Sequence, residues 1–147
     1  MFEELVVDGY NVIHAWKDLR PLLAASLEEA REGLIARLST MAQVTGISVT
    51  VVFDAHRTQA SQLSEEWRDG LRVVFTRRGH SADHAIERLA YLASERREPL
   101  VVSTSDSVHR SMLRGMGAAV IDPEELLRRV RAAEAELARQ LRSHSRP

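Results

Sequence analysis

The sequence contains no cysteine among its 147 residues. This absence excludes disulfide bonds and thiolate zinc sites and is typical of a reducing compartment, so we expect a cytoplasmic protein. No segment approaches the roughly 18 consecutive apolar residues of a membrane span, and strand-like sequence begins too early to leave room for a signal peptide. We therefore expect no contact with a membrane.

Lysine is almost lacking, because Lys17 is the only one and the other basic residues are arginines apart from the histidines. Arginine suits bidentate contacts with phosphate, although a GC-rich genome produces the same bias without any function. The formal net charge is −1, so a binding surface for polyanions must be local. Glycine-rich dinucleotide and P-loop signatures are also absent, which argues against a nucleotide-binding Rossmann fold.

The sequence does contain a regular alternation of strand-like and helix-like segments. Apolar or β-branched runs predict strands at residues 5–8, 47–53, 71–76, 100–104 and 118–121, and amphipathic spacing predicts helices at 27–45, 82–97, 105–115 and 123–142. Residues 14–23 are expected to be irregular, and residues 59–69 to form a short exposed helix or a loop. The alternation predicts an α/β fold: a three-layer α/β/α domain over residues 1–142 with a parallel sheet of about five strands, then a flexible tail at 143–147.

Helix-capping residues support these boundaries. Ser26 with Glu29 three residues later forms a capping box, and Gly46 stands where a helix C-cap belongs. Ser81 is in position to cap the helix at 82–97, and Asp122 precedes a proline at the first position of the last helix. The caps therefore place the start of each of these helices to within a residue or so.

Aspartates occur at four of the predicted strand-to-helix connections. Asp8 and Asp54 directly follow strands, whereas Asp83 and Asp106 begin helices. The carboxyl ends of parallel strands lie at one edge of a sheet, so we expect the four carboxylates to converge there. Like charges at such a site repel one another unless a cation neutralises them, and oxygen ligands favour a hard ion such as Mg²⁺ or Mn²⁺.

Each aspartate also has an ordinary structural explanation. Asp83 and Asp106 occupy positions typical of helix first turns and caps, and Asp54 could cap a loop. Asp8 is the hardest to explain in this way, because a carboxylate that closes an interior strand needs a partner. Asn11 could supply a hydrogen bond to it or could close a turn. We favour the metal site, with Asn11 orienting Asp8.

Cationic residues gather near the same edge of the predicted sheet. They are Arg57, Arg72, Arg77 and Arg78, with His56 and His80, and of these we expect Arg57, Arg77, Arg78 and His80 to contact RNA. Such clusters are most often solvated loop surfaces, but beside a metal site they also suit the backbone of RNA. Tyr10 and Trp16 could stack on a base, although Tyr10 could equally belong to the core.

Four blocks of the sequence resemble the YacP-like branch of the NYN domain family. They are Val7–Ile13, Val52–His56, Phe75–Thr76 with Ser81–Asp83, and Ser103–Asp106. The likeness runs from the first strand to about Leu127, and the four blocks in this order and spacing are strongly specific. It implies a PIN-like fold and a metal-dependent endoribonuclease, with a ribosome-linked role in mRNA cleavage that leaves 5′-phosphate and 3′-hydroxyl ends.

By position, the resemblance implies catalytic roles for Asp8, Asn11, Asp83 and Asp106. The metal would be held by Asp8, Asp83, Asp106 and also Asp54, although many other NYN relatives lack a carboxylate at the last position. Some relatives carry a further acid one helical turn after the last aspartate, and here that position is Arg110, which leaves the number of metals open. Glu87, one turn after Asp83, either assists the site or is an exposed helix residue.

Two other functions are compatible with parts of the pattern. A non-catalytic module that binds RNA or the ribosome is the alternative to the nuclease, but pure binding to a polyanion gains nothing from clustered aspartates. A receiver-like phosphoacceptor ranks last. Such a domain needs a second acid beside the first strand and a lysine after the fifth, and Asp8 stands alone while Asp122 follows the fifth strand.

Overall fold

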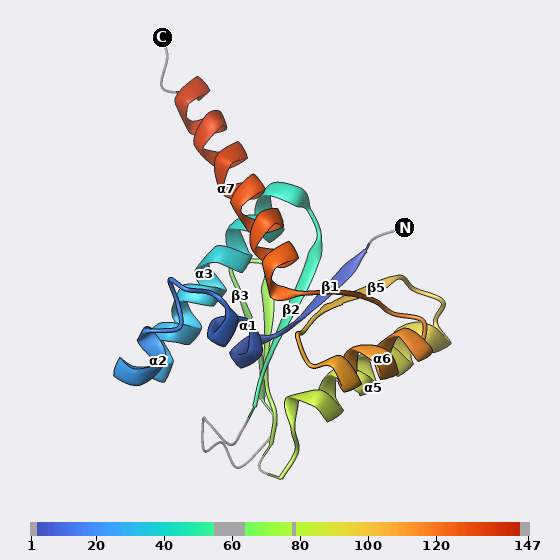
Figure 1. Cartoon of the computed structure of the whole chain (residues 1–147). Helices are drawn as coiled ribbons and strands as arrows, with labels where there is room; N and C mark the ends of the chain where they lie inside the picture. The colour runs from blue at the N-terminus through green and yellow to red at the C-terminus, as the bar shows by residue number, and fades with distance from the viewer. Residues whose placement is uncertain (1–2, 55–63, 78, 145–147) are drawn as a thin grey trace.

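A computed structural model describes residues 3–54, 64–77 and 79–144 of the chain. Its centre is a six-stranded sheet in the order β3-β4-β2-β1-β5-β6 (Figure 1). All neighbouring strands are parallel except β3 and β4, which pair antiparallel. The strands are β1 (Glu4–Asp8), β2 (Ser48–Phe53), β3 (Ser64–Arg68), β4 (Leu71–Phe75), β5 (Leu100–Ser103) and β6 (Ala119–Ile121).

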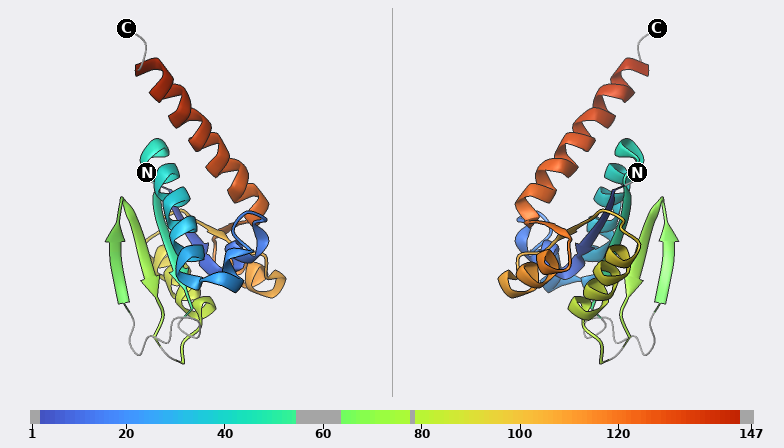
Figure 2. Two further views of the ribbon diagram at one scale, coloured as in Figure 1. Left: turned by 90° about the vertical axis from the view of Figure 1, so that its left-hand side faces the viewer. Right: turned by 90° about the vertical axis from the view of Figure 1, so that its right-hand side faces the viewer.

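Helices cover both faces of this sheet, as the predicted three-layer α/β/α architecture requires (Figures 1 and 2). They are α1 (Gly9–Ala15), α2 (Leu22–Ala25), α3 (Leu27–Thr45), α5 (Ala82–Glu95), α6 (Ser107–Gly115) and α7 (Pro123–His144). Helices α1, α3 and α7 pack on the face that includes Leu5 and Val7, and α5 and α6 pack on the face that includes Val6. The α/β fold class is confirmed, with alternate residues of the buried strand serving two cores.

The predicted helix caps are present. The Ser26 hydroxyl accepts a hydrogen bond from the Glu29 amide at 3.2 Å, and Gly46 ends α3 with a φ of 76°. The Ser81 hydroxyl accepts from the His84 amide at 3.2 Å at the start of α5. Asp122 accepts from the Glu125 amide at 2.8 Å at the start of α7.

The prediction of a loop or helix before residue 70 was wrong for the part that the structure describes. Residues 64–68 form β3, an antiparallel edge strand whose side chains are largely exposed, including Trp67. An edge strand with little apolar surface to bury shows no hydrophobic alternation, and charged residues there discourage pairing with other chains. Glu65 instead forms an ion pair with Arg72 of β4 at 2.7 Å.

The prediction of irregular structure at residues 14–23 was also wrong in part, because helices occupy both ends of that segment. Helix α1 begins at once at Gly9, and α2 forms a single turn at residues 22–25. A Cβ atom on Gly9 would overlap the Phe53 ring and lie 2.9 Å from the Val52 carbonyl oxygen. Glycine is therefore required sterically, because α1 starts in direct contact with the neighbouring strand.

Trp16 is also part of the core rather than a surface for stacking a base. Its indole is buried, and its Nε1 donates a hydrogen bond to the Pro123 carbonyl oxygen at 2.9 Å. Tyr10 is buried as well and lies against Phe53, with 5.2 Å between ring centroids. Within the described residues, no helix is both long and apolar enough to cross a membrane.

Candidate active site

A cluster of ionisable side chains lies at the edge of the sheet where the parallel strands end. Asp8 is the last residue of β1, Asp83 is in the first turn of α5, and His109 is in the first turn of α6. One ligand atom from each of these three residues lies within 4.8 Å of the others. Three connections that are distant in sequence therefore place two carboxylates and an imidazole where a single cation could contact all of them.

Asp8 is the most buried carboxylate of the cluster, with 8% of its surface exposed. Burial is the largest cause that raises its pKa, from 3.8 to about 6, and the negative charge of Asp83 adds to this effect. The Thr104 hydroxyl opposes the rise by donating a hydrogen bond to Asp8 Oδ2 at 3.1 Å. The site thus carries a net cost for a negative charge, which a bound cation would remove.

His109 is buried more deeply still, with 3% of its surface exposed. Its Nδ1 lies 3.4 Å from Asp83 Oδ1, and its Nε2 lies 3.6 Å from Glu87 Oε1. Neither ring nitrogen has a hydrogen-bond partner among the residues that the structure describes. One ring nitrogen of His109 together with the carboxylates of Asp8 and Asp83 matches the donor set of a divalent cation, so the residues present fit a metal ion.

The other two predicted metal-ligating aspartates stand beside this cluster. Asp106 is the N-cap of α6, and its Oδ1 accepts hydrogen bonds from the amides of Val108 and His109 at 3.0 and 3.1 Å. Its charge nevertheless reaches Asp8, whose pKa it raises slightly. Asp54 Oδ2 accepts a hydrogen bond from the Ala82 amide at the start of α5, at 3.2 Å. Both carboxylates anchor the helices that carry the cluster.

Asn11 has a different partner from the one that we expected. Its side-chain amide donates to Ser105 Oγ at 2.7 Å, and its Oδ1 accepts from the Ser105 amide at 2.9 Å. Asn11 therefore ties the start of α1 to the loop after β5, and Thr104 in that loop is the residue that hydrogen-bonds to Asp8. The expected orienting role of Asn11 is indirect.

A cationic cavity of about 590 Å³ lies along the first two turns of α5, the helix that carries Asp83. Its lining includes two of the predicted RNA-contacting residues, Arg77 and His80, together with His84 and Arg88 of α5. Asp83 and Glu87 face His109, whereas His84 and Arg88 follow them by one residue and so project from the adjacent side of the same helix. Two further predicted RNA-contacting residues, Arg57 and Arg78, lie outside the described residues.

Sequence reasoning did not identify His109 or Thr104 as partners of Asp8 and Asp83, and it left the role of Glu87 open. Two signals were available. His109 is four residues before the buried Leu113, which places it on the inward face of α6, and Glu87 is four residues after Asp83 on α5. Spacing alone indicates a face of a helix, but it does not indicate that two different helices bring these faces together.

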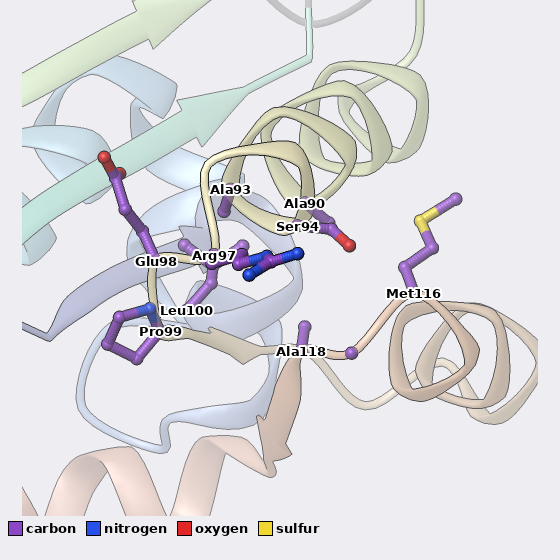
Figure 3. Close-up of a pocket in the computed structure, with 10 residues that line it drawn as sticks. Ala90, Ala93, Ser94, Arg97, Glu98, Pro99, Leu100, Met116 and Ala118 are labelled. Carbon is purple, nitrogen blue, oxygen red and sulfur yellow. The ribbon is translucent and has the colours of Figure 1, made fainter.

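A separate pocket of about 330 Å³ lies at the opposite edge of the sheet, where β5 begins and α5 and α6 end (Figure 3). Its walls are mainly the small or apolar side chains of Ala93, Ala118 and Met116, and Arg97 reaches across it. It lies at the opposite end of α5 from Asp83, whereas the cationic cavity lies along the first two turns of α5, which also carry Asp83. The acidic cluster and the cationic cavity are therefore the features that the fold places together.

Comparisons with known proteins agree on a single family. The model of the YacP-like NYN domain matches residues 5–147. The uncharacterized protein YacP of Bacillus subtilis (strain 168) is 38% identical over 138 residues, which cover 94% of this chain and 81% of that protein.

Two crystal structures of Rae1 (YacP) from Bacillus subtilis superpose closely on this chain. A mutant form gives a TM-score of 0.84 at 36% identity and covers 98% of this chain and 84% of its own. A second structure gives 0.83 at 37% identity and covers 96% and 80%. The identity and the coverage are high enough to relate the two proteins by descent as well as by fold.

Proposed function

This chain belongs to the YacP-like NYN domain family, and on that basis we propose that it is a metal-dependent endoribonuclease. The observation that carries the proposal is the buried carboxylate of Asp8, held beside Asp83 and His109 at the carboxyl edge of the sheet. A buried acid with a raised pKa and a charged neighbour is typical of a functional site. A module that only binds RNA has no use for this arrangement, because carboxylates repel a polyanion.

Asp8 and Asp83 are the residues that would hold Mg²⁺ or Mn²⁺. Asp106 and Asp54 would act from beside the ion, through their charge and through the helix starts that they cap. Thr104 keeps the Asp8 carboxylate in place, and Asn11 holds the loop that carries Thr104. When bound, such a metal lowers the pKa of a water molecule and neutralises charge on a scissile phosphate.

The RNA backbone would lie along the cationic cavity. Arg77, His80, His84 and Arg88 line it, and Asp83 belongs to the same helix turn as His84. Arginine side chains there bind phosphate oxygens and carry no base specificity, so they would position the strand rather than select a sequence. We include Arg57 and Arg78 in this surface on the sequence pattern alone.

The test is cleavage of RNA by the purified protein, both with free mRNA and with mRNA on translating ribosomes, in Mg²⁺ or Mn²⁺. We expect products with 5′-phosphate and 3′-hydroxyl ends, and loss of cleavage in EDTA or in Asp8→Asn. Asp69→Asn is the matched control, because Asp69 lies in the β3–β4 turn at the opposite edge of the sheet, where its φ of 52° suits asparagine.

Three results would decide against the nuclease. Cleavage that persists in Asp8→Asn or in EDTA would assign the activity to a different site or to a contaminant. RNA or ribosome binding without cleavage of any substrate would favour the non-catalytic module. An equal loss of activity in Asp69→Asn would show that the substitutions act through folding.

A further inference from the structure

We propose that this site selects a first-row transition ion, with Mn²⁺ bound in preference to Mg²⁺, because His109 supplies a nitrogen ligand. The inference rests on the proposed function, since it concerns the same metal. It goes further by assigning a ligand that the sequence pattern did not provide, an orienting partner for that ligand, and a metal preference.

The imidazole of His109 is buried without hydrogen-bond partners for its nitrogens among the described residues. It is 3% exposed, and its two nitrogens have no hydrogen-bond partner in the described part of the chain. Leaving a buried polar atom unpaired costs about 1–3 kcal/mol, so native proteins rarely keep two such atoms in one side chain. We therefore expect a bound ligand, such as a metal ion, to satisfy at least one of these nitrogens.

The two nitrogens of His109 face different groups. Nδ1 lies 3.4 Å from Asp83 Oδ1, which belongs to the cluster, whereas Nε2 lies 3.6 Å from Glu87 Oε1, one helical turn further along α5. A histidine that binds a metal commonly donates its other N–H to a carboxylate, which sets the tautomer and the ring orientation. This arrangement assigns Nδ1 as the metal ligand and Glu87 as the positioning residue, whose carboxylate lies at ion-pair distance from Nε2 in the metal-free protein and would accept its N–H when the metal binds.

An imidazolium ion bridging Asp83 and Glu87 without a metal is the competing explanation. Charge-assisted hydrogen bonds between nitrogen and a carboxylate are typically about 2.7–2.9 Å long, and both contacts here are longer. Neither contact has the geometry of a hydrogen bond. The distances therefore fit a ring that lies near the carboxylates and whose Nδ1 is free to bind a metal ion.

A nitrogen ligand changes the choice of metal. Mg²⁺ is a small, hard ion that prefers oxygen ligands and retains its waters. Imidazole is a better ligand for transition ions, and the affinity of mixed nitrogen and oxygen sites rises along the first-row series that begins with Mn²⁺. Two carboxylates with one imidazole therefore favour Mn²⁺ over Mg²⁺, whereas carboxylates alone would not discriminate as strongly.

The experiment measures metal binding directly, without RNA. Mn²⁺ is titrated into the full chain and followed by the electron paramagnetic resonance signal of the free ion, and Mg²⁺ is then added as a competitor. Pulsed measurements on the bound Mn²⁺ detect a ¹⁴N coupling if an imidazole is a ligand. The variants are His109→Gln, His109→Asp and Glu87→Gln, with His144→Gln as the control at the exposed end of α7.

We expect the wild-type protein and His144→Gln to show the ¹⁴N coupling, and both His109 variants to lack it. His109→Asp should still bind Mn²⁺ but lose most of its preference over Mg²⁺. Glu87→Gln should keep the coupling and bind Mn²⁺ about tenfold to hundredfold more weakly, as expected for loss of an orienting carboxylate. Circular dichroism of each variant checks that it is folded.

A coupling that is absent in the wild-type protein, or unchanged in folded His109→Gln, would overturn the inference. The inference would also be overturned if His109→Asp kept the wild-type preference for Mn²⁺ over Mg²⁺. These outcomes leave the nuclease proposal intact if cleavage still depends on Asp8 and on a divalent ion. If instead the protein binds Mn²⁺ through His109 but cleaves no RNA, the metal assignment holds and the proposed function fails.

Discussion

At the scale of single residues, Asp8 is the position where folding and function conflict. Its carboxylate ends an interior strand and is buried, so its negative charge is unfavourable in the metal-free protein. The Thr104 hydroxyl offsets only part of this cost. A residue that lowers stability in this way persists for a reason other than stability, and metal binding is the reason that its neighbours suggest.

The raised pKa of Asp8 predicts how stability depends on pH in the absence of metal. The pKa is about 6 when folded and 3.8 ordinarily, so the folded state binds more protons between these values. The free energy of unfolding should therefore fall by about 3 kcal/mol as the pH rises through this window. Asp8→Asn should abolish that fall and be the more stable protein at pH 7, as measured by urea denaturation in EDTA.

The control for this prediction is Asp69→Asn, which should keep the wild-type dependence on pH. If the contribution of Asp8 to the free energy of unfolding instead rose with pH in this range, the folded protein would stabilise the charged carboxylate. In that case burial of Asp8 would not be the dominant effect on its pKa.

Gly9 is the second residue whose identity is dictated by its surroundings. Gly9→Ala places a methyl group against the Phe53 ring and the Val52 carbonyl oxygen, so it should lower the free energy of unfolding by about 1–3 kcal/mol. Gly115→Ala is the matched control, since its Cβ would meet no atom within 4 Å and alanine favours a helix. Equal effects of the two substitutions in thermal denaturation would contradict the steric explanation.

At the scale of elements, Arg37 of α3 connects segments that are distant in the sequence. Its guanidinium forms a bidentate pair with Glu134 of α7 at 2.8 and 3.0 Å, and it contacts Asp18 at 2.7 Å. It also lies over the Trp16 ring, 5.1 Å from the ring centroid. The side chain is 18% exposed, so solvent screens these interactions less than it screens a surface pair.

Arg37→Gln should therefore lower the free energy of unfolding by about 1–3 kcal/mol, because it removes charge-assisted hydrogen bonds and a cation–π contact. Arg139→Gln removes a pair between exposed residues of α7 and should leave the free energy of unfolding nearly unchanged, because solvent screens the pair. Urea denaturation measures the free energy of unfolding of both variants, because urea, unlike guanidinium chloride, does not screen ion pairs. A loss in Arg37→Gln no larger than in Arg139→Gln would show that α3 and α7 are held by apolar packing alone.

At the scale of the whole molecule, the fold separates charges that the net charge of −1 conceals. Asp8, Asp83 and His109 meet where β1 ends and where α5 and α6 begin, and the cationic cavity is lined by His84 and Arg88 of α5. In the proposed function, the second surface would attract a polyanion and bring it to the first. Helix α7 extends away from both surfaces on the other face of the sheet (Figure 2).

This separation predicts that RNA affinity and metal binding can be changed independently. Arg77→Gln and Arg88→Gln should each weaken binding of single-stranded RNA and reduce the slope of log affinity against log salt by about 0.7, because each removes one phosphate contact. Arg131→Gln on α7 should leave both quantities unchanged. Fluorescence anisotropy across a salt series measures them, and a uniform effect of all three variants would place the RNA elsewhere.

Much of the architecture could be predicted because it depends on local signals. Apolar runs identified the buried strands, and Ser26, Gly46 and Asp122 marked helix ends through hydrogen bonds and a backbone angle that depend only on nearby residues. Strand β3 and helix α1 escaped prediction for opposite reasons. The former buries little, and the latter is short and begins through a close contact with another strand.

The sequence by itself therefore determined the α/β alternation, the two cores and the edge of the sheet to which Asp8 and Asp83 are delivered. Only the tertiary structure decided which groups meet there. In the folded chain Asn11 hydrogen-bonds to Ser105, Thr104 donates a hydrogen bond to Asp8, and His109 lies between two carboxylates of α5. The physical reason is that capping and periodicity act within a few residues, whereas ligand sets form where separate elements pack together.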